Sequence, residues 1–154
     1  MIIVRPIKTF PELQRLMPLF LEGFREMNKR HKAFDCDEEG FVKTLAWVLG
    51  GDTDKNVIGI AWDGNTPVGY GVGFDDTPIY SKRKHFLLWA LYVKPAWSKL
   101  AGKELFDGAE TFAASNGYDV LRANNGRLNG SAIKFFEKVL GMRRNRLEFT
   151  KQLS

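Results

Sequence analysis

The feature that most limits the fold of this chain is a long, almost uninterrupted apolar segment, HFLLWALYV, at residues 85–93. Such a run is typical of a strand that is buried on both faces of a sheet. A helical pattern over 101–116 follows, and then a short strand pattern over 119–123. Two strands joined through a helix lie parallel to each other in one sheet. The sequence therefore predicts a sheet with a parallel pair and helices on both faces.

The other segments alternate between strand and helix patterns. Thr9 and Glu12 have the spacing of a capping box, and Pro18 should kink or split the helix that follows. Asp63-Gly64-Asn65 is a strong hairpin signal. In chain order we predict a strand over 2–6, a helix over 9–28, a helix marked by apolar residues 41–49, strands over 57–62, 67–74 and 85–93, a helix over 101–116, a strand over 119–123, a helix over 132–140 and a strand over 146–151. This order predicts one α/β (α+β) domain over residues 1–154, with a mixed sheet of six to seven strands.

Composition excludes several classes of protein. Apolar residues make up 44% and charged residues 27%, as in a soluble globular chain. No apolar run approaches the ~20 residues that span a bilayer. Cys36 is the only cysteine, so an internal disulfide and a cysteine-rich zinc site are excluded, and His31 is too isolated to suggest a metal. We expect a cytoplasmic protein with no membrane partner and no metal.

Charge is distributed unevenly along the chain. Residues 1–76 hold 9 Lys or Arg and 12 Asp or Glu, whereas residues 77–154 hold 14 and 6. Residues 81–103 contain six basic residues and no acidic one. Such a field would attract a polyanion to the C-terminal half, although a basic face exposed to solvent explains the charge equally well.

Three phrases in the last third of the chain carry a resemblance to a known family. They are Leu91-Tyr92-Val93-Lys94-Pro95, the segment 97–102 (WSKLAG) and the segment 129–138 (NGSAIKFFEK), which is followed by Gly141-Met142. With the element order, they resemble the GNAT superfamily of N-acyltransferases. In that family a strand ends in an apolar-x-Val-x-Pro phrase, a glycine-containing loop opens a helix, and an Asn-x-x-Ala-x-x-x-Tyr phrase follows later.

The resemblance implies that acetyl-CoA binds along the end of the 85–93 strand and at the start of the next helix. A helix N-terminus offers backbone N–H groups and a partial positive charge of about +0.5 to a diphosphate. Lys99 and Lys103 would add cationic contacts. Asn129 would either hydrogen-bond the cofactor or act as a helix N-cap, and Trp97 would either cover the cofactor or only pack in the loop. The residues expected to contact acetyl-CoA are Leu91, Tyr92, Val93, Trp97, Ser98, Lys99, Leu100, Ala101, Gly102, Lys103, Asn129 and Phe136.

The chain departs from the family pattern at three of these positions. Trp97 replaces a Gln or Arg, and Leu100 replaces the first glycine of the loop, where its side chain could block the approach of a phosphate. Phe136 stands where many members have a tyrosine that protonates the departing thiolate. Only Gly102 of the loop motif is retained.

Amine acylation needs a group that takes a proton, because a lysine-type amine has a pKa of ~10.4. The 85–93 strand carries no carboxylate. If the strand alternates regularly, residues 85, 87, 89, 91 and 93 share one face, and His85 is the only titratable side chain among them. We therefore consider His85 as base or water-positioner, or as a histidine that merely sits at the strand entrance. Asp75 and Asp76 are alternatives, unless they only form a turn.

Two further features allow a functional and a structural interpretation. Ser131 either hydrogen-bonds the thiolate in place of the missing tyrosine or caps the last helix. The acidic segment 35–39 either forms a wall for a cationic acceptor or caps and stabilises the second helix.

The leading hypothesis is an N-acetyltransferase that moves an acetyl group from acetyl-CoA to a primary amine by direct attack in a ternary complex. The amine can belong to a small molecule or a protein, and a homodimer is left open. The alternative is a GNAT-shaped binding or structural module without catalysis. Nucleic-acid binding through residues 82–84 and 143–146 ranks last, because no aromatic-basic recognition motif accompanies the charge.

Overall fold

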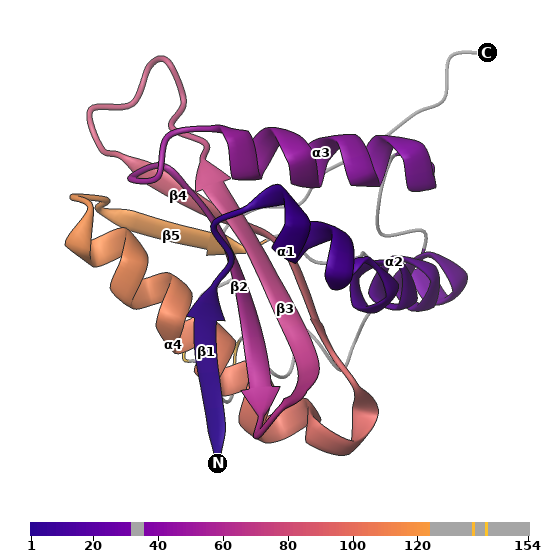
Figure 1. The fold of residues 1–154 in the computed structure, drawn as a ribbon. Coiled ribbons are helices and arrows are strands. Elements are labelled where there is room, and N and C mark those ends of the chain that lie inside the picture. The colour runs from indigo at the N-terminus through magenta and orange to yellow at the C-terminus, as the bar shows by residue number, and fades with distance from the viewer. Residues whose placement is uncertain (32–35, 124–136, 138–140, 142–154) are drawn as a thin grey trace.

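One mixed sheet organises the part of the chain that the computed structural model describes, residues 1–31, 36–123, 137 and 141 (Figure 1). Its five strands are β1 (Ile2–Pro6), β2 (Asn56–Asp63), β3 (Thr66–Asp75), β4 (His85–Val93) and β5 (Val120–Ala123), in the spatial order β1-β2-β3-β4-β5. Neighbours are antiparallel except β4 and β5, which are parallel. The mixed α/β fold is confirmed with five strands. The predicted helix over 132–140 and strand over 146–151 lie outside the described residues.

Four α-helices and one 3₁₀ turn complete the described fold. They are α1 (Phe10–Arg15), α2 (Met17–His31), α3 (Glu38–Gly50), the 3₁₀ turn η1 (Pro95–Trp97) and α4 (Ser98–Ser115). Thr9 caps α1, because its hydroxyl accepts a hydrogen bond from the backbone N–H of Glu12 at 3.3 Å. The helix predicted over 9–28 is split at Leu16, so that Pro18 falls in the first turn of α2, where its missing N–H costs nothing.

The helices cover opposite faces of the sheet (Figure 1). The α1–α3 face is packed by residues such as Phe20, Phe41 and Leu45 against Ile60 and Tyr70 of the sheet. The α4 face is packed by other side chains, with Ala101 and Leu105 of α4 against Ala61 and Val68. Ile60 and Ala61 are consecutive residues of β2, so the alternation of a strand sends one to each core.

Helix α2 lies unusually close to β3. A Cβ atom added at Gly23 would lie 2.4 Å from the hydroxyl oxygen of Tyr70, whose side chain is fully buried. The absence of a side chain at Gly23 therefore allows α2 to pack directly on the Tyr70 ring. This contact fixes the position of the residues next to Gly23 on α2.

A β-bulge in β4 corrects the prediction that residues 85, 87, 89, 91 and 93 share one face. Val72 of β3 pairs with Ala90, but Gly73 pairs with Leu88, so Trp89 is an extra residue. The bulge reverses the alternation: Trp89 stacks on Phe41 of α3 with ring centroids 5.7 Å apart, whereas Leu91 and Val93 pack with the α4 core. Regular alternation fails here because two residues of β4 oppose one position of β3.

Candidate functional site

The start of α4 lies at the C-terminal end of β4 and is open. The helix begins at Ser98, directly after η1, and not near Ala101 as predicted. The 3₁₀ turn leads straight into the helix, so residues 98–100 form its first turn and not a loop. No side chain caps this N-terminus, and its first turn contains no acidic residue. The partial positive charge of the helix therefore has no carboxylate opposite it within α4.

Neither of the two unusual side chains in this segment closes the start of α4. The Leu100 side chain is 71% exposed. The indole Nε1 of Trp97 donates a hydrogen bond to Oδ2 of Asp63 at 2.9 Å, and Trp97 packs against the buried cluster that includes Ala61 and Val68. Trp97 is thus held against the β2–β3 end of the sheet. The described residues at this helix N-terminus fit an anionic group such as a diphosphate.

The remaining predicted contacts of this segment fall into two groups. Ser98, Lys99 and Leu100 are exposed, whereas Ala101 and Gly102, which follow them in the helix, are buried. Lys103 donates to Oδ2 of Asp107 at 2.8 Å, and this hydrogen bond, with the negative charge of Asp107, raises the pKa of Lys103. Ser98 and Lys99 are therefore the polar side chains placed at the helix start.

The end of β4 presents its side chains to both cores. Leu91 and Val93 face α4, and Tyr92 faces α2. The described pairing between β4 and β5 runs from His85↔Val120 to Leu88↔Ala123. It thus reaches the residue before the bulge at Trp89. The segment 91–93 extends beyond the described part of β5.

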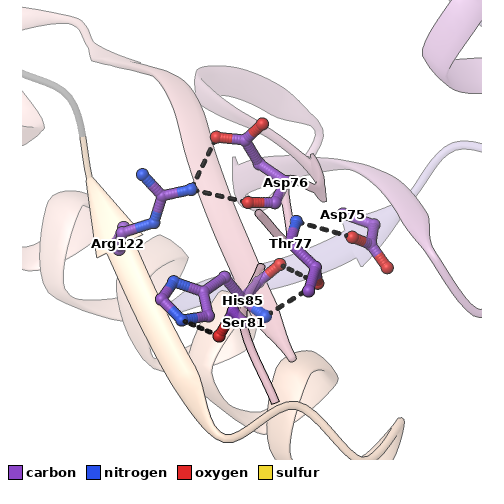
Figure 2. Close-up of polar contacts among 6 residues, drawn as sticks. All are labelled: Asp75, Asp76, Thr77, Ser81, His85 and Arg122. Carbon is purple, nitrogen blue, oxygen red and sulfur yellow. Dashed lines mark hydrogen bonds and ion pairs between the residues drawn. The ribbon is translucent and has the colours of Figure 1, made fainter. Parts of the chain in front are cut away.

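His85 lies at the opposite end of β4, inside a polar network (Figure 2). Its backbone N–H donates to Oγ1 of Thr77 at 2.9 Å, and its carbonyl accepts a hydrogen bond from the backbone N–H of Asp76 at 3.0 Å. Its ring Nε2 lies 3.4 Å from Oγ of Ser81, and the buried Nδ1 has no partner within the described part of the chain. A buried ring nitrogen without a hydrogen bond is uncommon in native proteins.

Asp75 and Asp76 accept hydrogen bonds at the connection between β3 and β4 (Figure 2). Asp76 accepts a hydrogen bond from Nη2 of Arg122 at 2.6 Å. Asp75 accepts hydrogen bonds from the Thr77 backbone N–H at 2.9 Å and from the Tyr118 hydroxyl at 2.8 Å. Burial acts to raise the pKa of Asp75, but these hydrogen bonds outweigh it and the pKa is lowered. Burial and the bond to Asp75 raise the pKa of Tyr118. The structural interpretation of both aspartates is the one that these contacts support.

The described part of the acidic segment 35–39 also has structural partners. The Asp37 side chain accepts a hydrogen bond from the Gly40 backbone N–H at 2.8 Å and caps α3. Glu38 forms an ion pair with Arg25 of α2, and the hydrogen bond between the two side chains lowers the pKa of Glu38. Glu39 pairs with Lys43 one turn further on. Asp35 lies outside the described residues.

A carboxylate that the sequence did not single out reaches β4 from α2. The hydroxyl of Tyr92 donates a hydrogen bond to Oε2 of Glu22 at 2.9 Å. Glu22 also borders a cavity of about 610 Å³ along α2 and a smaller one of about 170 Å³ between α2 and Lys94. No local pattern could reveal this contact, since 70 positions separate the two residues.

Other predictions can be placed only in part. Asn129, Ser131 and Phe136 lie outside the described residues. Within the described ranges there is no group of three or more His, Cys, Asp or Glu placed to hold a metal ion. None of the described helices is long and apolar enough to span a bilayer.

Comparison with known proteins identifies the family. The acetyltransferase (GNAT) family matches residues 13–142, which is most of the chain. The chain belongs to this family. None of the curated proteins gives a significant match.

Solved structures with a similar fold include two aminoglycoside acetyltransferases. One, from an uncultured soil metagenomic sample and in complex with sisomicin, has a TM-score of 0.72 and 17% identity over 99% of this chain and 97% of that chain. The other, aminoglycoside N-acetyltransferase AAC(6')-Iy in complex with CoA, has a TM-score of 0.74 and 12% identity over 100% and 96%. A transcriptional regulator from Bacillus halodurans is similar too, with a TM-score of 0.75 and 15% identity over 99% and 100%. At these identities the similarity shows the fold.

Proposed function

We propose that this protein is an N-acetyltransferase that moves an acetyl group from acetyl-CoA to a primary amine by direct attack in a ternary complex. The observation that carries the proposal is the open, uncapped start of α4 next to the end of β4, with Leu100 exposed and Trp97 bonded to Asp63. Backbone N–H groups of this first turn, with Lys99, would hold the diphosphate. The pantetheine arm would run along the main chain of residues 91–93.

The proposed reaction forms one bond and breaks another. The amine nitrogen bonds to the thioester carbonyl carbon, the carbon–sulfur bond breaks, and its electron pair leaves on the CoA sulfur. The amine loses one proton, which we assign to His85 through an ordered water chain, and Ser131 would donate a hydrogen bond to the sulfur. His85 lies four residues before the bulge residue Trp89, which is about 13 Å along the strand at about 3.3 Å per residue. Its unpartnered Nδ1 supports this assignment, and most of the rate enhancement would come from positioning and electrostatics.

The fold similarity supports an amine-rich acceptor but does not identify it. Two of the similar structures are aminoglycoside acetyltransferases, and one contains sisomicin. We therefore place compounds with several amino groups first among candidate acceptors for this chain.

Binding of acetyl-CoA is measured directly by isothermal titration calorimetry with the wild-type chain and two matched variants. Ser98→Asp places a carboxylate in the first turn of α4, and Ser115→Asp makes the same change at the other end of the helix. We expect Ser98→Asp to weaken acetyl-CoA binding at least about tenfold through repulsion of the diphosphate, while it stabilises the helix by about 0.5 kcal/mol. Ser115→Asp should leave the affinity unchanged.

If neither acetyl-CoA nor CoA binds the wild-type protein at millimolar concentration, the transferase proposal is wrong. A second candidate, a binding or structural module, is favoured by Phe136 in place of the usual tyrosine. It predicts that acetyl-CoA binds but that no CoA thiol is released with a broad panel of amines. Turnover of any amine would eliminate it.

A further inference from the structure

The hydroxyl group next to the His85 ring already uses its hydrogen elsewhere. Oγ of Ser81 donates to the carbonyl oxygen of Arg83 at 2.9 Å and accepts a hydrogen bond from the backbone N–H of Arg83 at 3.1 Å. Nε2 of His85 lies farther from the same oxygen, at 3.4 Å (Figure 2). A hydroxyl has one hydrogen and two lone pairs. Because the shorter contact takes the hydrogen, Ser81 presents a lone pair to the ring.

This lone pair determines which ring nitrogen of His85 carries a hydrogen. A neutral imidazole has one N–H donor and one bare nitrogen that accepts. A bare Nε2 would face the lone pair of Ser81, whereas an Nε2–H group can donate to it. The hydrogen therefore lies on Nε2, and Nδ1 is the basic atom of the ring. Nδ1 is buried and has no partner within the described part of the chain, so bulk solvent does not reach it.

A second buried nitrogen without a partner among the described residues lies on the neighbouring strand. It is Nε of Arg122, whose Nη2 is bonded to the side chain and the carbonyl of Asp76 at 2.6 and 2.7 Å. Arg122 pairs with Leu87, and His85 is two residues before Leu87, so both side chains leave the sheet on one face. In Figure 2 the imidazole ring lies between Ser81 and the Arg122 side chain.

The two buried nitrogens complement each other. Nε of a guanidinium carries a hydrogen and donates, whereas a bare Nδ1 accepts. One water molecule can accept from the first and donate to the second, as buried waters do at polar groups that have no other partner. A hydrogen on Nδ1 would instead place two donors toward that water. The carboxylate of Asp76 compensates the charge of Arg122, so the ring can receive a proton beside it.

We propose that Ser81 is a positioning residue that holds His85 with its hydrogen on Nε2, and that Nδ1 of His85 and Nε of Arg122 bind the last water of the proton path. This inference rests on the proposed function, in which His85 takes the amine proton. The last water gives a proton to Nδ1 and receives one from the water before it, and the first water of the path receives its proton from the amine nitrogen. The ring ends with a hydrogen on each nitrogen and one positive charge.

Nitrogen NMR reads the tautomer without any need for activity. The chain has two histidines, so the variant His31→Gln, labelled with ¹⁵N-histidine and free of a histidine tag, contains His85 as its only imidazole. Long-range proton–nitrogen spectra at about pH 8.5, where a free imidazole is neutral, distinguish the nitrogen that carries hydrogen from the bare one. We expect the hydrogen on Nε2. A hydrogen on Nδ1 would overturn the inference.

Three variants in the His31→Gln background assign the tautomer to Ser81. Ser81→Ala should move both nitrogen signals toward the average of the two tautomers, whereas Ser81→Thr retains a hydroxyl and should keep the original spectrum. Ser115→Ala removes an exposed hydroxyl at the end of α4 and should change nothing. Unchanged signals in Ser81→Ala would show that Ser81 does not hold the ring.

Kinetics separate this role from a merely structural one. With 1,5-diaminopentane as the amine, Ser81→Ala should lower kcat about fivefold and change the KM for acetyl-CoA less than about twofold. In the His85→Gln background the same substitution should lower kcat no further, because the two side chains act as one unit. An equal loss in both backgrounds would mean that Ser81 only shapes the turn at Arg83. If no amine is acetylated, the proposed function fails, while the nitrogen spectra still test the tautomer.

A crystal structure that shows ordered water tests the second half of the inference. We expect one water within about 3 Å of both Nδ1 of His85 and Nε of Arg122. Arg122→Lys keeps a positive charge beside Asp76 but has no nitrogen in place of Nε, and this water should be lost from its structure. A protein group bonded to either nitrogen in the wild-type structure would overturn this part of the inference.

Discussion

The two ends of β4 use their polar groups in different ways. At the beginning of the strand, the main-chain groups of His85 are bonded to Thr77 and Asp76, and Arg122 of β5 is bonded to Asp76 (Figure 2). At the end of the strand, α4 starts without a capping side chain, and Glu22 borders open cavities. The first end joins three strands through contacts within the protein. The second leaves hydrogen-bonding groups for a ligand.

The two ends of β4 differ because one joins neighbouring strands and the other lies next to the proposed cofactor site. The described β4–β5 pairing covers the first four residues of β4, and the hydrogen bond from Arg122 to Asp76 joins β5 to the β3–β4 connection at the same end. A site for a flexible cofactor needs donors that are held in place but have no partner inside the protein. Four predictions make this comparison sharper or break it.

The largest effect concerns His85. His85→Gln keeps a side chain that can bond Ser81 but removes the basic ring, and we expect kcat to fall about 100-fold with no change in KM for acetyl-CoA. Steady-state kinetics with 1,5-diaminopentane measure this change. If kcat is unaltered, the beginning of β4 is purely structural and the proton leaves through another group.

The next largest effect concerns the packing of α2 on β3. Gly23→Ala places a Cβ atom 2.4 Å from the buried hydroxyl of Tyr70, so α2 must move, and we expect a loss of about 2 kcal/mol in unfolding free energy. Gly108→Ala, within α4, is the matched control. Its Cβ would lie 3.6 Å from the Val4 side chain, an ordinary contact, and alanine is a better helix former than glycine. Urea denaturation of both variants measures the difference. Equal stability of the two would show that α2 is not held by this contact.

A smaller effect concerns the contact that holds the indole beside the start of α4. Trp97→Phe keeps an aromatic ring but removes the hydrogen bond from Nε1 to Asp63. We expect a loss of about 1 kcal/mol in stability and acetyl-CoA affinity that is about threefold weaker, because η1 is less firmly held. Thermal unfolding and calorimetry provide the two values. Tighter acetyl-CoA binding would instead indicate that Trp97 obstructs the site.

The smallest effect concerns Leu100. Its side chain is exposed, so Leu100→Gly, which restores the glycine of the family motif, should change acetyl-CoA affinity by less than about threefold. The cost in helix stability should stay below about 1 kcal/mol near the helix end. A gain in affinity of more than tenfold in calorimetry would show that Leu100 blocks the start of α4 after all.

Much of the fold could be predicted because its signals are local. The Thr9 cap and the turn at Gly64, where φ is +60°, depend on residues a few positions apart. The parallel β4–β5 pair was predicted for the same reason, since the crossover helix leaves one sensible arrangement. The capping role of Asp37 was one of two interpretations that the sequence allowed, and its contact with Gly40 agrees with it.

The site was harder to predict from the sequence because its geometry depends on pairing between distant segments. The bulge at Trp89 exists only where β4 meets β3, so strand alternation placed Leu91 and Val93 on the wrong face. The hydrogen bond from Trp97 to Asp63 joins segments 34 positions apart, so no local pattern indicates that the indole lies on the sheet next to the start of α4 at Ser98. For Glu22, no sequence pattern pointed to its contact with Tyr92.

By itself the sequence determined the helix and strand order of the described residues and the resemblance to the GNAT superfamily, since these follow from local periodicity, caps and short motifs. Only the tertiary structure decided which side chains line the two ends of β4. The physical reason is distance along the chain: Glu22 meets Tyr92 across 70 positions, and that contact requires α2 to be packed on the sheet, where Gly23 lies against Tyr70.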